Sequence, residues 1–321
     1  MIQNNSKKRK RLNNNNISKN NLTIVTHNCG GQSLAINGNK QYLCSERGYF
    51  SQDNYGKYNI ENPDLTNKKS PISLSLPADL WCLQEHVYNG EKGIAIYDRN
   101  KSVIFSKSRE IYSIPFRILY KSKNYSLLII NLHGKIISPS SSFNQIEKAI
   151  EILEKVVILS KETNVIILGD FNFEIMNPAF LKDCLWSMQD YSIRGKYSEK
   201  QKLINNNIEN FMNRLLDVVK NIKKNYDVYP NKKGDFTNAW TIGNPKHNKD
   251  FFADKSNYLP SVDFCLTSKN LIGLQDINYT IHTQFLATHK KKKFTYMIDD
   301  FDHAPITFNF TFKKGVEIIQ S

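Results

Sequence analysis

Short apolar runs separated by turn-forming residues make up most of the chain after Leu22. Apolar runs of this length that stop at Gly, Asn, Asp or Pro are typical of β-strands. The pattern predicts strands at residues 22–28, 79–85, 93–98, 102–106, 125–133, 164–170, 261–266 and 305–310.

Two segments instead place apolar side chains at helical spacing, which predicts helices over residues 143–161 and 201–223. Strands in pairs with only occasional helices favour sheets covered by helices over a regular βαβ alternation. Residues 30–75, rich in Asn, Lys and Gly, read as a long loop.

The first part of the chain lacks this pattern. Residues 1–21 contain KKRKR and NNNN and are too polar to fold alone, so we expect a disordered basic tail followed by one domain over residues 22–315. A length of 321 residues is compatible with a single large domain. The KKRKR cluster fits a nuclear-import signal or a nucleic-acid-binding arm, and equally a solvated tail.

The charge balance indicates polyanionic partners. The formal net charge is +14, of which the tail carries +6, so the rest of the chain is basic as well. A basic body favours nucleic acid or anionic lipid headgroups. No apolar run approaches the ~20 residues of a membrane span, and the five cysteines form no CxxC pair. We therefore expect a soluble, intracellular monomer with reduced thiols.

The sharpest local motif is Leu-Gly-Asp-Phe-Asn at 168–172, directly after an apolar strand. Residues two apart on an extended chain point to the same side, so Asp170 and Asn172 can face one target together. A carboxylate and an amide in this arrangement can orient a water and hold a phosphate oxygen. A Gly-Asp pair alone is more often a turn, so the motif is informative only together with other polar residues at strand ends.

Further polar residues stand at the ends of other predicted strands or against their apolar face. They are Asn28, Glu85, His133, Asp263, Asp302 and His303. Such residues build a poor core but a good site on a rigid scaffold.

These residues occur in the order typical of one superfamily. The motifs are Asn28, Gln84-Glu85, Asn131-Leu132-His133, Gly169-Asp170-Phe171-Asn172, Asp263 and Asp302-His303, spread over residues 22–310. The chain resembles the endonuclease/exonuclease/phosphatase superfamily, which includes DNase I-like nucleases, abasic-site endonucleases, sphingomyelinases and inositol-polyphosphate phosphatases. The resemblance implies an α/β fold, a four-layer sandwich of two mixed β-sheets flanked by helices.

The resemblance also implies catalytic roles in the hydrolysis of a phosphoester by an activated water. His303, oriented by Asp263, would activate the water or contact the scissile phosphate. Asp170 would position the nucleophile or protonate the leaving oxygen, with Asn172 and His133 contacting phosphate oxygens. Which group is acid and which is base stays open at this point.

A metal cofactor follows from the same resemblance. Glu85 would be the principal ligand of a Mg²⁺ ion, which Mn²⁺ can replace, with Asn28 and Asp302 completing its surroundings. A hard cation with carboxylate and water ligands neutralises charge on phosphoryl oxygens.

Two departures from family patterns narrow the substrate. Gly30 stands where abasic-site endonucleases have an acid, and Phe264 follows Asp263 where phosphoinositide 5-phosphatases have Arg. Both departures weaken the more specific interpretations, an abasic-site endonuclease and a phosphoinositide 5-phosphatase. A run of four lysines, Lys290, Lys291, Lys292 and Lys293, precedes His303 and could grip a phosphate backbone, although such a run is usually a solvated loop.

We therefore predict a Mg²⁺-dependent phosphodiesterase, with a nuclease favoured. The enzymatic alternatives are sphingomyelinase-like and inositol-phosphate phosphatase activities. An alternative of another class is a binding module for nucleic acid or protein that has lost catalysis. The complete set of Glu85, Asp170 and His303 argues against a decayed site.

Overall fold

The structure is a computed structural model of the 321-residue chain. It describes residues 20–29, 33–36, 39–42, 50–52, 58–60, 72–88, 91–100, 102–107, 110–134, 143–159, 164–172, 199–232, 235, 237, 262–283, 288–290, 293–296 and 303–320. The predicted tail at 1–21 lies almost entirely outside them.

Two six-stranded sheets form the body of the protein. The first has the order β14-β17-β1-β6-β7-β8, with β1 parallel to β6 and the other neighbours antiparallel. Its strands are β1 (Asn21–Asn28), β6 (Leu80–Tyr88), β7 (Glu91–Asp98), β8 (Val103–Ser106), β14 (Leu274–Ile281) and β17 (Ile306–Phe312).

The second sheet has the order β12-β13-β11-β10-β9-β18, with β10 parallel to β11. Its strands are β9 (Ile111–Tyr120), β10 (Lys123–His133), β11 (Asn164–Asp170), β12 (Tyr226–Tyr229), β13 (Asp263–Ser268) and β18 (Glu317–Gln320). Each sheet is mixed, which confirms the predicted sandwich of two mixed sheets.

An apolar layer lies between the sheets. Ile24 and Leu80 from the first sheet share one core with Ile129, Ile166 and Leu168 from the second. Because side chains alternate along a strand, the remaining side chains of β11 point to the opposite face and form a second core. Both faces of β11 are therefore buried, which explains its continuous apolar sequence.

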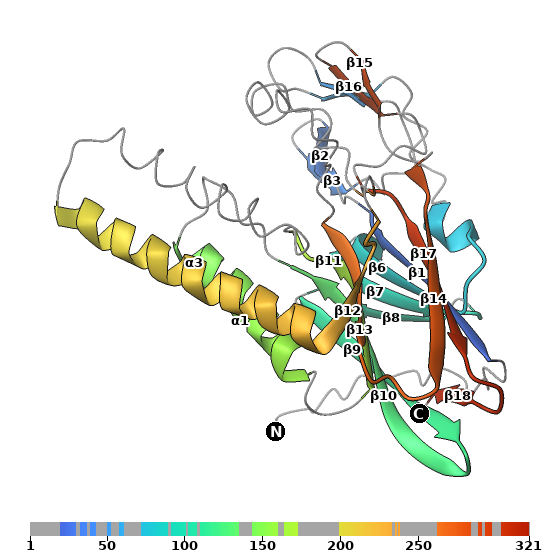
Figure 1. Cartoon of the computed structure of the whole chain (residues 1–321). Coiled ribbons are helices and arrows are strands. Elements are labelled where there is room, and N and C mark those ends of the chain that lie inside the picture. The colour runs from blue at the N-terminus through green and yellow to red at the C-terminus, as the bar shows by residue number, and fades with distance from the viewer. Residues whose placement is uncertain are drawn as a thin grey trace, which may run out of the picture.

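The two long helices, α1 (Phe143–Leu159) and α3 (Glu199–Asn225), pack side by side on the outer face of the second sheet (Figure 1). Within the described part of the chain, the outer face of the first sheet is covered by the short 3₁₀ helix η1 (Ile72–Ser75) and the residues after it. Both predicted helices are confirmed, and both cover the second sheet.

The eight predicted strands are confirmed as β1, β6, β7, β8, β10, β11, β13 and β17. The pattern missed β9, β12, β14 and β18. Pro115 in the middle of β9 argues against a strand by sequence alone, yet it lies opposite Leu128 within the sheet. Strand β14 is a sheet edge with several exposed polar side chains, so it lacks an apolar run.

The loop predicted at 30–75 contains short strands, which corrects that prediction. Strands β2 (Ser33–Ile36) and β3 (Asn39–Tyr42) pair with each other. Strands β4 (Phe50–Gln52) and β5 (Tyr58–Ile60) join β15 (Thr288–Lys290) and β16 (Lys293–Tyr296) in a four-stranded sheet. Strand pairing between chain segments far apart in sequence supplies what local apolar patterning does not show.

Candidate active site

Strand register places three of the predicted site residues next to one another. His133 at the end of β10 lies opposite Asp170 at the end of β11, and Asp170 lies opposite Asp263 at the start of β13. Asp170 continues the face of Ile166 and Leu168, so its side chain points into the layer between the sheets. The fold therefore gathers these groups at one end of that layer.

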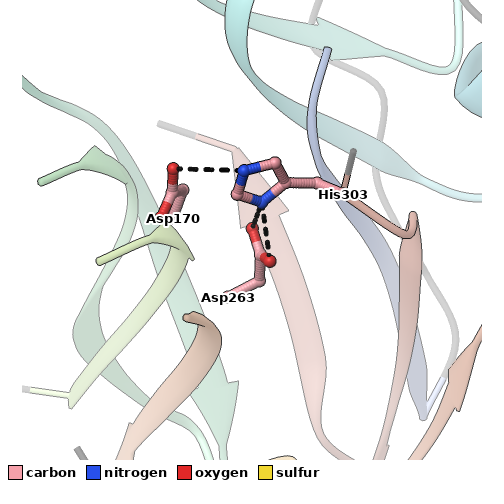
Figure 2. Close-up of side chains that lie close together, drawn as sticks. All are labelled: Asp170, Asp263 and His303. Atoms are coloured by element: carbon pink, nitrogen blue, oxygen red, sulfur yellow. Dashed lines mark hydrogen bonds and ion pairs between the residues drawn. The ribbon is translucent and has the colours of Figure 1, made fainter. Parts of the chain in front are cut away.

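Asp263 and His303 form a buried, hydrogen-bonded pair (Figure 2). The imidazole Nδ1–H of His303 donates to both carboxylate oxygens of Asp263, at 2.9 and 3.1 Å. A bond from Nδ1–H fixes the tautomer and directs Nε2 away from Asp263. That Nε2 lies 4.0 Å from Oδ2 of Asp170.

Asp170 is fully buried and is held by two donors. The side-chain amide of Asn28 donates to its Oδ2 at 2.8 Å, and the backbone N–H of Asn172 donates to its Oδ1 at 2.7 Å. Its Oδ2 is also 4.0 Å from Nε2 of His133. The carboxyl group therefore lies between two imidazoles, at distances longer than a direct hydrogen bond but short enough for one bridging oxygen atom.

Burial raises the pKa of Asp170 from its ordinary value of 3.8 to about 7. The charge of Asp263 adds to the increase, whereas His303 and the hydrogen bonds from Asn28 and Asn172 oppose it. A carboxyl group with a pKa near neutrality can both accept and release a proton under ordinary conditions.

Glu85 stands at an irregularity in the pairing of β6 with β7, between Leu83 and His86. Its backbone φ of 49° lies in the left-handed region, which is uncommon for a residue other than glycine. The bulge re-aims its carboxylate, which is about one quarter exposed, to within 3.5 Å of Nε2 of His133. Glu85 therefore lies at the more exposed side of the same cluster.

Asn172 also adopts a left-handed backbone conformation, with φ of 57°. Its side-chain amide donates to the carbonyl of Gly134 at 3.0 Å, and the Gly134 N–H donates to the Asp170 carbonyl at 2.7 Å. These bonds join the ends of β10 and β11. In this structure Asn172 thus fixes the backbone around Asp170.

Gly169 allows the close approach of β10 and β11 just before Asp170. Its φ is 144°, and a Cβ atom on it would come within 1.9 Å of the Leu132 carbonyl oxygen. The Gly-Asp sequence at this strand end therefore reflects strand packing and not a turn.

A buried amide network links the two sheets behind Glu85. The Asn131 side chain donates to the carbonyls of Leu83 and Ala95, both at 3.0 Å, and accepts a hydrogen bond from Gln84. Gln84 also donates to the hydroxyl of Thr26 at 3.1 Å. The network fixes β10 against the strand segment that carries Glu85.

His27 is a positioning candidate that the sequence pattern did not reveal. It is buried, and its Nε2–H donates to the backbone carbonyl of His303 at 3.2 Å. Burial lowers the pKa of His27 to about 3, so the ring is neutral at ordinary pH. A histidine within a strand carries no sequence signal for such a role.

The described part of the structure does not place two of the predicted groups, Asp302 and the lysine run, at the site. Asp302, expected near the metal, lies outside the described residues. Lys290 ends β15 and Lys293 begins β16, opposite each other in a hairpin, while Lys291 and Lys292 lie outside the described residues.

A divalent metal fits the chemistry of the donors. Glu85 offers a partly exposed carboxylate beside a buried one, which suits Mg²⁺ because this ion keeps several waters. The atoms of Asp170, Asp263 and His303 also lie within 4.8 Å of one another. However, Nδ1 of His303 donates to Asp263, so this pair is better suited to orienting a base than to binding a metal.

No family model and no curated protein matches this sequence. Solved structures that align with most of this chain include two nucleases and a toxin, all at low identity. The catalytic domain of APE2 from Xenopus laevis is 14% identical, with 94% of each chain covered and a TM-score of 0.38. An AP endonuclease from Archaeoglobus fulgidus is 14% identical, with 90% of this chain and 99% of that chain covered and a TM-score of 0.39.

The beta toxin of Staphylococcus aureus is 13% identical, with 89% of this chain and 99% of that chain covered and a TM-score of 0.39. Within the described residues, no helix has both the length and the apolar character needed to cross a membrane.

Proposed function

We propose that this protein is a metal-dependent phosphodiesterase that hydrolyses nucleic acid with an activated water. The observation that carries the proposal is the position of Asp170. Its Oδ2 lies 4.0 Å from Nε2 of both His133 and His303, and its pKa is about 7. Two imidazoles around a proton-exchanging carboxyl group suit the transfer of a phosphoryl group to water.

In the proposed reaction, the Asp263–His303 pair contacts the scissile phosphate through Nε2 of His303. The hydrogen bond from Nδ1 keeps the ring in one tautomer, so that Nε2 keeps one orientation toward the phosphate. His133, on the other side of Asp170, contacts a second phosphate oxygen. Charge that builds on the phosphoryl oxygens is thus met from two sides.

Asp170 transfers the proton in this proposal. Asn28 and the backbone of Asn172 hold the two carboxyl oxygens, so the group has a fixed orientation toward the reacting atoms. With a pKa of about 7, it takes the proton of the attacking water, or returns one to the leaving oxygen, near neutral pH.

Glu85 would hold the metal, with the carbonyl oxygen of Asn28 and the carboxylate of Asp302 as further ligands. A bound divalent ion supplies electrostatic stabilisation of the phosphoryl oxygens. Asn172 contributes by fixing the backbone at the end of β11, and its side chain would also contact a phosphate oxygen.

Nucleic acid is favoured over other phosphoesters because of charge. The formal net charge is +14, and the run from Lys290 to Lys293, whose first and last residues lie in β15 and β16, precedes His303 by 13 to 10 residues in the sequence. Phosphate contacts dominate the affinity of proteins for nucleic acid. Sphingomyelin and inositol phosphates are the alternative substrates, and a catalytically inactive binding module is the alternative of another class.

The test is degradation of single-stranded DNA, double-stranded DNA and RNA by the purified full chain, with Mg²⁺ or with EDTA. His303→Ala removes the imidazole that the Asp263 pair orients. His282→Ala is the matched control, because this half-buried histidine bonds Thr307 on a neighbouring strand. Cleavage that needs the metal and His303 but not His282 is the expected result.

Cleavage of sphingomyelin vesicles or inositol phosphates in place of nucleic acid would assign the alternative substrate class. Folded protein that hydrolyses none of these substrates in the presence of Mg²⁺ or Mn²⁺ would contradict the enzymatic proposal.

A further inference from the structure

Thr237 lies between the two chain segments that carry Asp263 and His303, and it is fully buried. Its Oγ1 accepts hydrogen bonds from the backbone N–H groups of Val262 and Asp263, both at 3.2 Å. Its own carbonyl accepts a hydrogen bond from the N–H of Ala304 at 2.8 Å. One residue thus binds the backbone at Asp263 and directly after His303.

The strand pairing explains why a hydroxyl is needed at this position. On one side, β13 pairs with β11 as far as the Asp170–Asp263 position. On its other side, the pairing with β12 ends at the Tyr229–Cys265 position. Beyond that point Thr237 supplies an acceptor in place of a strand. A buried N–H without an acceptor is destabilising, because it has lost its hydrogen bonds to water.

The segment before Thr237 is itself fixed to the first sheet. Tyr279 on β14 donates its hydroxyl hydrogen to Oδ2 of Asp235 at 2.5 Å and accepts from the N–H of Lys232 at 3.2 Å. Asp235 also accepts from the N–H of Lys232 at 2.9 Å. Thr237 therefore follows a segment whose position is set by β14, so its hydroxyl has a defined place to hold Asp263.

A further bond extends this arrangement to Asp170. The carbonyl of Val262 accepts a hydrogen bond from the N–H of Phe171 at 2.8 Å. Val262 is thereby linked to Thr237 on one side and to the residue after Asp170 on the other. Movement at Thr237 would be transmitted to Asp170 and to Asp263.

We propose that Thr237 is a positioning residue that sets the geometry of the Asp263–His303 pair relative to Asp170. This inference rests on the proposed phosphodiesterase function. In the proposed reaction, Thr237 contacts no reacting atom. Its hydroxyl fixes where the Asp263 carboxylate lies, and its carbonyl fixes the chain directly after His303. Asp263 and His303 are 40 residues apart in sequence, so this contact joins parts of the site that no local structure connects.

The test compares three variants of the full chain. Thr237→Val keeps the shape but removes the acceptor, and Thr237→Ser keeps the acceptor. Thr267→Val is the matched control, because Thr267 is fully buried on β13 and its hydroxyl has no hydrogen-bond partner among the described residues. Kinetics with Mg²⁺ on the nucleic acid that the wild type cleaves, and NMR spectra of protein with ¹⁵N-labelled histidine, are recorded for each.

We expect Thr237→Val to lower kcat on the order of 100-fold with little change in KM, because a small misplacement of catalytic groups is that damaging. The His303 imidazole resonances should shift in Thr237→Val and stay in place in Thr237→Ser and Thr267→Val, and Thr237→Ser should restore most of kcat. Wild-type kcat together with unchanged His303 resonances in folded Thr237→Val would overturn the proposal.

Two complications are covered by the design. If Thr237→Val does not fold, Thr237→Cys replaces it, because sulfur is a weak acceptor. Equal kcat and His303 resonances in the Cys and Ser variants would then contradict the role of the hydroxyl. If the wild type cleaves no phosphodiester, the proposed function fails, while the His303 resonances still decide whether Thr237 sets the position of the pair.

Discussion

The layer between the two sheets has an apolar end and a polar end, and both are built from the same faces of the same strands. On β11, Ile166 and Leu168 lie in the apolar end and Asp170, two residues further, lies in the polar end. On β10, Leu127 and Ile129 are followed in the same way by Asn131. One face of the same strands thus contributes to the core and, at the strand ends, to the site.

The difference between the ends shows how stability and chemistry are divided. At the apolar end, burial of Ile, Leu and Phe side chains stabilises the fold without directional requirements. At the polar end every buried group needs a partner, and Asp170 remains costly even with two donors because burial disfavours its charge. The rigid apolar end stabilises the fold enough to hold such a carboxyl group in place.

The largest expected effect on stability belongs to the apolar end. Phe116 of β9 is buried between the sheets, so Phe116→Ala should lower the free energy of unfolding by about 3–5 kcal/mol through lost burial and a cavity. Urea denaturation would measure the loss. Because Phe116 lies outside the site, kcat well below the melting temperature should stay near wild type, and a proportionate loss of kcat would show that the ends are not separate.

The second effect is a gain in stability, and it is expected when Asp170 is replaced. Its pKa is raised in the folded state from 3.8 to about 7. Below pH 3.8 both states are protonated and the shift does not affect stability; from there to pH 7 the unfolded state ionises first, so stability falls as pH rises. The cost is complete above pH 7, at up to about 4 kcal/mol.

Asp170→Asn should therefore abolish activity and raise the melting temperature at pH 8, with the gain disappearing near pH 4. Thermal unfolding in EDTA at both pH values measures it, since EDTA removes any contribution of bound metal. An equal change in melting temperature at the two pH values would show that the ionisation of Asp170 is not responsible.

Asn131 offers a third test, at the boundary between the two ends. Asn131→Leu should lower the free energy of unfolding by about 1–3 kcal/mol, because the carbonyls of Leu83 and Ala95 lose their donor. Asn124→Ala, on an exposed position of β10, is the control and should change stability by less than about 0.5 kcal/mol. A neutral Asn131→Leu would show that this network contributes nothing beyond its volume.

The smallest effect is expected on the helical face. Arg214 of α3 bonds Glu147 and Glu154 of α1, at 2.6 and 3.0 Å, with all three side chains more than one third exposed. Arg214→Met should cost about 0.2–1 kcal/mol, and the difference should shrink in high salt. Lys220→Met on the same helix provides the control, and a salt-independent loss would indicate packing by the Arg214 stem instead.

Much of the fold could be predicted because its strands are locally patterned. Residues 165–168 form an uninterrupted apolar run within the strand predicted at 164–170, and β11 has these bounds. Strand β14 could not be found this way, because an edge strand exposes half of its side chains and needs a neighbour to exist as a strand. The short strands within 30–75 were missed because each has only three or four residues, too few for a local apolar pattern.

The candidate site could be predicted in its residue types but not in its contacts. Motif order brought forward Asp170, Asp263 and His303, and the structure places them together. Thr237 and His27 gave no signal, because a threonine or histidine that binds a backbone group looks like any other. Their role depends on the backbone they meet, which is distant in sequence.

The sequence by itself determined the alternation of apolar and polar positions, and with it eight of the strands, the two long helices and the acidic and imidazole groups available for chemistry. Only the tertiary structure decided that Asp170 lies opposite Asp263 and beside two imidazoles, and that its pKa rises to about 7. The physical reason is that patterning acts between near neighbours, whereas burial and electrostatic interaction depend on which distant strands meet.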